Sequence, residues 1–200
     1  NFLIPNMALP QTFIFIGRSG SGKGTQAELL IHHFTERGEP VFYVQTGEQF
    51  RQFLARDSYS TQLAKAVSSV GNRQPDFLAI YMWADLLVNK FQGKGHLFFD
   101  GSPRSLVEAQ ALDTAMTFYQ RELVYVIALH ISHTCATDRL TKRARHDDDE
   151  SGIQKRLAWY DKDVAPALVY YRTNSRYRLV EIDGDRPIEV VHADILKQCE

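Results

Sequence analysis

The stretch GRSGSGKGT, residues 17–25, decides the fold of this 200-residue chain. It follows a β-rich run at residues 12–16 and opens an amphipathic helical pattern, which is the setting of a phosphate-binding loop. Its glycines let consecutive backbone N–H groups turn toward an anion, and Lys23 adds a positive charge for the outer phosphates. The usual pattern ends GK[ST], whereas here Gly24 separates Lys23 from Thr25. We predict a nucleotide site; the alternative, an ordinary Gly/Ser loop, does not explain the lysine or the flanking pattern.

The composition of the chain indicates a single globular domain and argues against several kinds of partner. Hydrophobic residues make up 44% of the chain, enough for one core, and a net charge of −1 argues against nucleic acid or a membrane as the main partner. Cys135 and Cys199 form no CxxC pair, so we expect reduced thiols in the cytoplasm and neither a zinc site nor a disulfide framework. Residues 1–11 are too short to span a bilayer and lack the basic start of a signal peptide, so we expect a frayed leader or an expression remnant.

Five short apolar runs predict strands at residues 12–16, 41–45, 96–100, 123–129 and 177–182. Such runs are typical of a parallel sheet buried on both faces, and helical patterns lie between them. This alternation predicts a three-layer α/β domain whose ligands bind beyond the carboxyl ends of the strands. About fifty residues with a helical pattern separate the second run from the third, so we expect an inserted helical lobe there.

Charged side chains follow the predicted strands. Asp100 ends the run HLFFD and could hold the water shell of a magnesium ion on bound phosphates, or could simply begin the turn DGSPR. Arg139 and Arg143 lie four residues apart on a predicted helix, where they repel each other unless an anion lies between them. A solvated basic face, or pairing with the acidic run at 147–150, is the alternative. Several guanidinium groups near one phosphate site are typical of phosphoryl transfer.

Taken together, FIGRSGSGKGTQ, TGEQFR, DGSPR, RLTKRARHDD and QKRLAWY resemble the adenylate kinase family of nucleoside monophosphate kinases. The resemblance implies a single three-layer α/β/α P-loop kinase domain over residues 12–195 with a five-stranded parallel sheet. It also implies a helical insertion at 46–75 that binds the monophosphate, a minimal lid region at 139–156, and a monomeric protein. The implied reaction is reversible transfer of the γ-phosphoryl group of Mg·ATP to AMP, giving two ADP.

The resemblance also assigns residues to this reaction. The implied ATP-binding residues are Gly20, Ser21, Gly22, Lys23, Gly24, Thr25, Arg139, Arg143, Arg186 and Ile188. The implied AMP-binding residues are Thr46, Gly47, Arg51, Asn72, Arg73, Gln74, Gly101, Arg104, Glu108, Arg145 and Arg156. The groups implied to be catalytic are Lys23, Arg104, Arg143, Arg145 and Arg156. Asp100 and Thr25 would hold Mg²⁺ through water, and no zinc is expected.

The chain departs from the family pattern in ways that affect the choice of acceptor. The family usually has Gln where this chain has Glu108, and a carboxylate can only accept hydrogen bonds. Thr46 favours AMP, whereas Glu108 would suit GMP or CMP; alternatively, Glu108 faces solvent and the backbone reads the base. Ser102 stands where the family often has an aromatic residue, which makes the pocket roomier. Only Ala144 separates Arg143 from Arg145, so the long lid and its zinc are expected to be missing.

Two further functions stay open at this point. A kinase on the same fold with another acceptor, such as UMP or a sugar, would differ in the residues that bind the acceptor. A nucleotide-dependent switch without turnover would need a base-reading NKxD segment, which the sequence lacks, and has no need for so many arginines.

Overall fold

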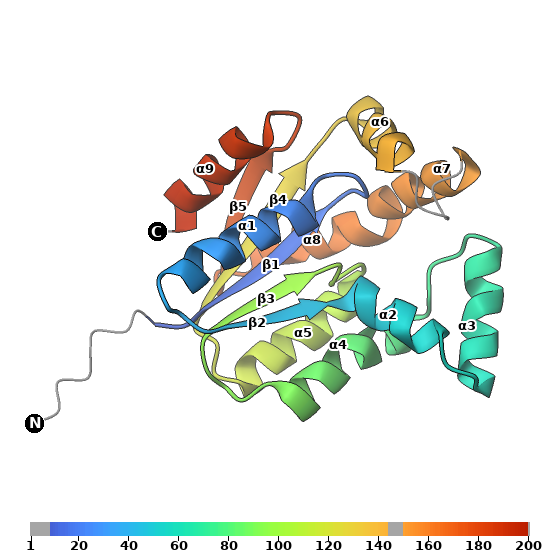
Figure 1. Cartoon of the computed structure of the whole chain (residues 1–200), viewed down its shortest axis with the longest axis horizontal. Helices are drawn as coiled ribbons and strands as arrows, with labels where there is room; N and C mark the ends of the chain where they lie inside the picture. The colour runs from blue at the N-terminus through green and yellow to red at the C-terminus, as the bar shows by residue number, and fades with distance from the viewer. Residues whose placement is uncertain (1–8, 144–149, 200) are drawn as a thin grey trace, which may run out of the picture.

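The computed structural model describes residues 9–143 and 150–199. Within them, five strands form one parallel sheet in the order β2-β3-β1-β4-β5 (Figure 1). The strands are β1 (Gln11–Gly17), β2 (Val41–Gln45), β3 (His96–Asp100), β4 (Leu123–His130) and β5 (Tyr177–Asp183). The predicted three-layer α/β fold with a five-stranded parallel sheet is confirmed.

Helices cover both faces of the sheet because successive strand side chains point to opposite faces. On β1, Phe13 and Phe15 pack toward one face, while Ile14 and Ile16 pack toward the other, and all four are buried. Figure 1 shows one helical layer in front of the sheet and the other behind and below it. The first layer is α1 (Lys23–Glu36) and α9 (Ile188–Cys199), and the second is α4 (Asp76–Lys90), α5 (Leu106–Phe118) and α8 (Ala165–Thr173).

The sheet begins one residue earlier than predicted. Gln11 belongs to β1, because it pairs in parallel with Leu123 of β4. Its backbone N–H also donates to His96 Nδ1 at 3.2 Å, and its carbonyl accepts from Arg121 Nη2 at 2.7 Å. The expected leader at residues 1–11 is therefore wrong at Gln11, and residues 1–8 lie outside the described part of the chain.

Between β2 and β3, the chain forms α2 (Thr46–Leu54) and α3 (Tyr59–Ser69) before α4. These helices share a small core of Phe53, Ala64, Leu78 and Met82. Ser58 caps α3 by accepting from the backbone N–H of Thr61 at 3.2 Å. Figure 1 shows α3 standing away from the sheet, so residues 46–75 place helices beside the carboxyl ends of the strands.

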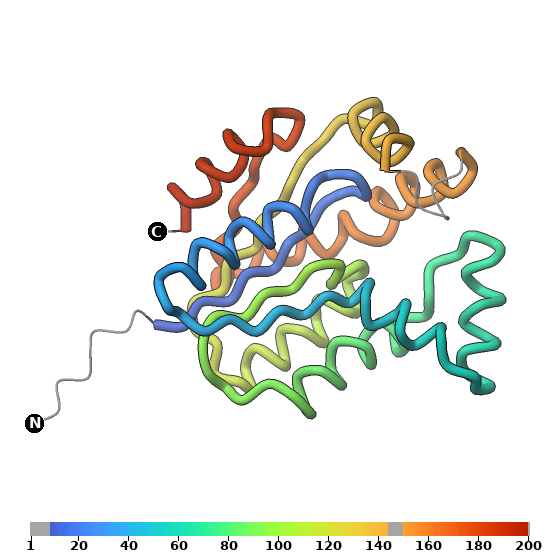
Figure 2. The backbone as a smooth tube through the Cα atoms, viewed as in Figure 1, coloured from blue at the N-terminus to red at the C-terminus, as the bar shows by residue number. Residues whose placement is uncertain are grey.

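The chain after β4 forms α6 (His133–Arg143), α7 (Glu150–Trp159), the π-helical turn η1 (Tyr160–Val164) and α8. Residues 144–149 lie outside the described ranges, so only the flanks of the expected lid region at 139–156 are seen. Figure 2 shows the loops after β1 and β3 meeting at one end of the sheet, between these flanks and the insertion. Among the described residues, no helix is long and apolar enough to cross a membrane.

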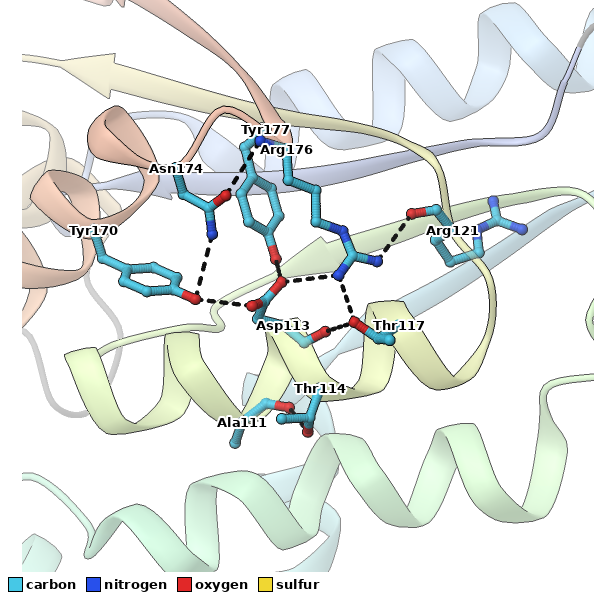
Figure 3. A network of polar contacts seen from close by, with 9 residues as sticks. All are labelled: Ala111, Asp113, Thr114, Thr117, Arg121, Tyr170, Asn174, Arg176 and Tyr177. Atoms are coloured by element: carbon cyan, nitrogen blue, oxygen red, sulfur yellow. Dashed lines mark hydrogen bonds and ion pairs between the residues drawn. The ribbon is translucent and has the colours of Figure 1, made fainter.

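A polar network fixes the opposite end of the sheet. The Asp113 carboxylate on α5 accepts hydrogen bonds from Tyr170 Oη at 2.9 Å, from Arg176 Nη1 at 3.2 Å and from Tyr177 Oη (Figure 3). Burial and this carboxylate both raise the pKa of the Tyr177 hydroxyl, so it stays a donor. The network ties α5, α8 and the start of β5 together, away from the site described next.

Candidate active site

The phosphate-binding loop leaves β1 and turns directly into α1. Gly20 has φ +83°, and a Cβ there would lie 2.9 Å from the carbonyl oxygen of Ala136, so this turn requires glycine. Gly22 occupies the N-cap of α1 in the left-handed region, with φ +88°. The backbone N–H groups at the start of α1 therefore face the loop and can bind an anion.

Lys23 folds back over this loop. Its Nζ donates to the carbonyl oxygens of Gly17 and Arg18, each at 2.8 Å, and lies 3.4 Å from Ser21 Oγ. Burial lowers the pKa of Lys23 to about 8, opposed by the charge of Asp100 and reinforced by nearby arginines. A bound phosphate would reverse this shift by supplying the opposite charge.

A large cavity of about 940 Å³ opens over the loop. It collects all ten residues predicted for ATP, together with part of the predicted acceptor site. The predicted residues that line it are Gly20, Ser21, Gly22, Lys23, Gly24, Thr25, Gly47, Arg51, Asp100, Gly101, Arg104, Arg139, Arg143, Arg186 and Ile188.

A smaller pocket of about 60 Å³ adjoins the large one. Lys23, Gly101 and Arg104 line both spaces, while Arg73 and Arg156 line only the smaller one. Two compartments therefore meet at a lysine and an arginine. At about 60 Å³, the smaller pocket could hold a phosphate group but not a whole nucleotide.

The loop after β4 and the loop after β5 form the outer wall of the large cavity. Arg139 Nη2 donates to the Gly184 carbonyl oxygen at 2.9 Å. Gln26 Nε2 donates to the Ile188 carbonyl oxygen at 3.0 Å, which anchors this wall to α1. Arg186 forms an ion pair with Asp194 at 2.7 Å. This wall combines the guanidinium groups of Arg139 and Arg186 with the exposed apolar side chain of Ile188, and a planar base could stack against them.

Three of the predicted acceptor residues are held by contacts with different parts of the chain. Arg51 forms an ion pair with Glu48 at 2.6 Å on α2, at the rim of the large cavity. Arg73 pairs with Asp76 at 2.8 Å and lies 3.6 Å from Asp163 of η1. Gln74 turns toward α3, where its Nε2 donates to the Ala64 carbonyl oxygen at 2.9 Å.

Four of the predicted acceptor residues line neither space: Thr46, Asn72, Gln74 and Glu108. Thr46 nevertheless adjoins the large cavity, because its neighbour Gly47 lines that cavity. Arg145 falls in the segment outside the described residues.

Glu108 is fully buried, with none of its surface exposed. Its carboxylate accepts from Trp83 Nε1 at 3.2 Å and from the Arg104 backbone N–H at 2.6 Å. The nearby Ser102 hydroxyl acts to lower the pKa of this carboxyl. Burial raises the pKa of Glu108, while these donors and the charges of Arg104 and Arg73 oppose that rise. The alternative that Glu108 faces solvent is wrong.

Asp100, at the end of β3, is one of the two residues predicted to hold Mg²⁺ through water. A Cβ on Gly24 would be only 3.2 Å from Asp100 Oδ2, so the carboxylate lies against the start of α1. Thr25 is exposed and lines the large cavity with Asp100. Among the described residues, no group of three or more His, Cys, Asp or Glu side chains could hold a metal by itself. The two residues therefore fit an ion that is held mainly by nucleotide phosphates and water.

Sequence analysis missed residues that support this site. Arg18, inside the loop, donates from Nη2 to Asp161 Oδ1 at 2.6 Å and from Nη1 to the Ile131 carbonyl oxygen at 3.1 Å. Its guanidinium also lies over the Tyr160 ring, 4.8 Å from the ring centroid. A basic residue is unusual within a Gly/Ser loop, and this feature of the sequence could have marked Arg18. No local signal marked Trp83, whose position in α4 indicates only a core residue.

Comparison with known proteins points to one family. A sequence model of the family described as "Adenylate kinase" matches residues 15–176. The chain is 32% identical to "Adenylate kinase 1" of a Synechocystis species over 191 residues, which cover 96% of this chain and 98% of that protein. It is 34% identical to "Adenylate kinase" of a Cyanothece species, with 91% of each chain covered. It is also 32% identical to "Adenylate kinase" of Flavobacterium psychrophilum, over 84% of this chain and 87% of the relative.

Proposed function

Because the chain belongs to the adenylate kinase family, it is an ATP-dependent nucleoside monophosphate phosphotransferase, and we propose that the phosphates of ATP and AMP meet at Lys23 and Arg104, where the large cavity adjoins the smaller pocket. The observation that carries this proposal is that Lys23 and Arg104 line both compartments. The reaction is reversible transfer of the γ-phosphoryl group of ATP to the phosphate of AMP, giving two ADP.

ATP would occupy the large cavity. Its base would lie between Arg139 and the wall formed by Arg186 and Ile188, and its phosphates would lie in the loop from Gly20 to Thr25. Binding would draw Lys23 Nζ away from the Gly17 and Arg18 carbonyls toward the outer phosphates. The negative charge of the phosphates then compensates the positive charge of the buried lysine.

AMP would enter from the side of the helical insertion. Arg51 would leave Glu48 and bind the acceptor phosphate together with Arg104 and Arg156, while Thr46 and Gly47 would adjoin the base. The backbone of Asn72, Arg73 and Gln74, together with Gly101, would complete the acceptor site. Glu108 would contribute as the buried support of this pocket, and Arg145 would reach it from the expected minimal lid at residues 139–156.

No general base is required, because the acceptor phosphate is already an anionic nucleophile. The work of the side chains is to hold two phosphates in line and to offset the charge that spreads over the transferring group. Lys23 of α1, Arg143 of α6, Arg156 of α7 and Arg104 in the loop between β3 and α5 line the two cavities.

Mg²⁺ bound to ATP would supply further charge neutralisation, and we place its water shell against Asp100 and Thr25. The carboxylate lies close to the start of α1, and the hydroxyl lines the same cavity. We also propose that the protein acts as a monomer in the cytoplasm. The free thiols of Cys135 and Cys199 are consistent with a reducing compartment.

A coupled assay of Mg·ATP with AMP, GMP, CMP, UMP or dTMP tests the proposal. We expect AMP to be the preferred acceptor and ADP to be the product of both substrates. Lys23→Met is the control, since it keeps the length of the side chain and removes its charge. Equal inactivity with all five acceptors would contradict the proposal, as would full activity of the control variant.

A further inference from the structure

The side chain of Arg73 lines the smaller pocket, whereas the proposed acceptor site uses only the backbone of this residue. Arg73 lies in the loop between α3 and α4, and its side chain is 21% exposed. It shares the pocket of about 60 Å³ with three other cations, Lys23, Arg104 and Arg156. Like charges around so small a space repel one another, so the pocket attracts an anion.

The rest of the pocket is largely apolar. Its remaining walls include the side chains of Phe15, Ile16, Pro103, Trp159, Tyr160 and Val164. Walls of this kind exclude water and lower the local dielectric, which strengthens the attraction between the cations and an anion. A phosphate group fits both the charge and the volume of this space.

Two carboxylates hold Arg73 from outside the pocket. Arg73 Nη1 donates to Asp76 Oδ1 at 2.8 Å, and Arg73 Nε lies 3.6 Å from Asp163 Oδ2 of η1. Neither Asp76 nor Asp163 lines the pocket, whereas Arg73 does. A guanidinium carries five N–H donors, and Nη2 of Arg73 has no hydrogen-bond partner in the part of the chain that the structure describes. The side chain therefore keeps donors for a phosphate while its carboxylate partners stay outside.

The same contacts set the position of Arg73 relative to Arg104. Asp76 Oδ1, which accepts from Arg73, also accepts from Ser105 Oγ at 2.6 Å. Ser105 directly follows Arg104 in the chain. The hydrogen bond from Arg73 lowers the pKa of Asp76, so this carboxylate is ionised at neutral pH. One carboxylate thus ties the loop that carries Arg73 to the loop that carries Arg104.

We propose that the guanidinium of Arg73 binds the acceptor phosphate in the smaller pocket, together with Arg104 and Arg156. This inference rests on the proposed function and adds a side chain to its acceptor site. A planar guanidinium can donate two parallel hydrogen bonds to phosphate oxygens, which a lysine cannot do. Asp76 and Asp163 are positioning residues, because they hold Arg73 at the pocket without lining it.

The test compares AMP with adenosine, which has the same base and sugar but no phosphate. The two dissociation constants, measured by calorimetric titration, give the ratio of Kd for adenosine to Kd for AMP, which reports what the phosphate contributes. Arg73→Gln removes the charge but keeps a donor for Asp76, and the ratio should fall by about tenfold, the size of one hydrogen bond to a charged group. The Kd for adenosine should stay unchanged, whereas a merely structural role of Arg73 would weaken both ligands alike.

Three further variants complete the design. Arg56→Gln is the matched control, because Arg56 is an exposed arginine of the same insertion that lines neither cavity, and it should leave the ratio unchanged. Asp163→Asn removes a charge that competes with the phosphate for Arg73, so the ratio should stay at or above the wild-type value. Arg73→Lys keeps the charge but loses the planar fork, and the ratio should fall by about threefold. If Arg73→Gln fails to fold, Arg73→Lys provides the test alone.

Failure of this inference can be told apart from failure of the proposed function. If the wild-type protein does not phosphorylate AMP, the proposed function fails. If it phosphorylates AMP but Arg73→Gln or Arg73→Lys keeps the wild-type ratio, only the role of the Arg73 side chain is overturned. A fall in Arg56→Gln or Asp163→Asn as large as that in Arg73→Gln would also overturn it, because the effect would then not depend on a guanidinium in the pocket.

Discussion

Replacing Trp83 with Phe tests the buried carboxylate beneath the acceptor site. Trp83 is 3% exposed and its indole N–H donates to Glu108 at 3.2 Å. Phe keeps most of the apolar surface, including the edge-to-face contact with Phe99, but removes this donor from a carboxylate. A hydrogen bond to a charged group contributes about 1.5–3 kcal/mol, and the smaller ring adds a packing loss of about 1 kcal/mol. We therefore expect the free energy of unfolding to fall by about 2–4 kcal/mol.

Part of this loss should depend on pH. Burial raises the pKa of Glu108 in the folded protein, and the loss of a donor raises it further. A raised pKa means that the folded state holds the proton more tightly, so the penalty of the variant is small where Glu108 is protonated. The unfolded state is the same for both proteins, so the penalty grows as the pH rises from the folded pKa of Glu108 in the wild type through its higher folded pKa in the variant. A bond to a neutral carboxyl is weaker by about 1–2 kcal/mol, which sets the expected difference between acid and neutral pH.

The assay is urea unfolding of the wild-type and Trp83→Phe proteins at pH 5 and pH 8, followed by circular dichroism. Trp159→Phe is the control, because the Trp159 indole donates to no carboxylate among the described residues. Its penalty should be the same at both pH values. The reasoning is refuted if Trp83→Phe costs less than about 0.5 kcal/mol, or if its penalty is as independent of pH as that of the control.

Three further outcomes follow from the site. Because burial lowers the pKa of Lys23 to about 8, binding of Mg·ATP at pH 8.5 should take up part of a proton, measured by calorimetry in buffers of different ionisation enthalpy; equal uptake by Lys23→Met would contradict this. Arg143→Ala and Arg156→Ala should each lower kcat by about 10²–10³-fold while circular dichroism stays unchanged, and near-normal rates in both would exclude them from the site. Asp161→Asn removes the ion pair that holds Arg18, so kcat should fall by about 3–10-fold with little loss of stability; an unchanged kcat would show that the loop does not need this support.

Much of the fold could be predicted because its signals are local. The glycine-rich loop and Lys23 lie within one short segment, and each strand is a single apolar run. The parallel sheet and the two helical layers then follow from general rules for alternating strands and helices. The strand order β2-β3-β1-β4-β5 comes from the structure alone. The start of β1 at Gln11 could not be predicted, since its hydrogen bonds come from His96 and Arg121, which are distant in sequence.

The candidate site was harder to predict in its buried parts. The position of Glu108 four residues after Arg104 marks it as unusual, but no local pattern shows that its partner is Trp83 on the preceding helix. Likewise, Arg18 and Asp161 are separated by most of the chain and meet only because η1 packs beside β1. Such contacts depend on tertiary packing, which sequence periodicity does not encode.

The central claim is that donor and acceptor phosphates meet at Lys23 and Arg104. A crystal structure with two adenosines joined by a chain of five phosphates tests it most directly, because one molecule then carries both bases and the phosphates that connect them. We expect one adenosine beside Arg139, the other beside Thr46, and the intervening phosphates in contact with Lys23, Arg104 and Arg156. The claim is contradicted if the phosphate chain bypasses Lys23 and Arg104, or if those side chains still point away from it.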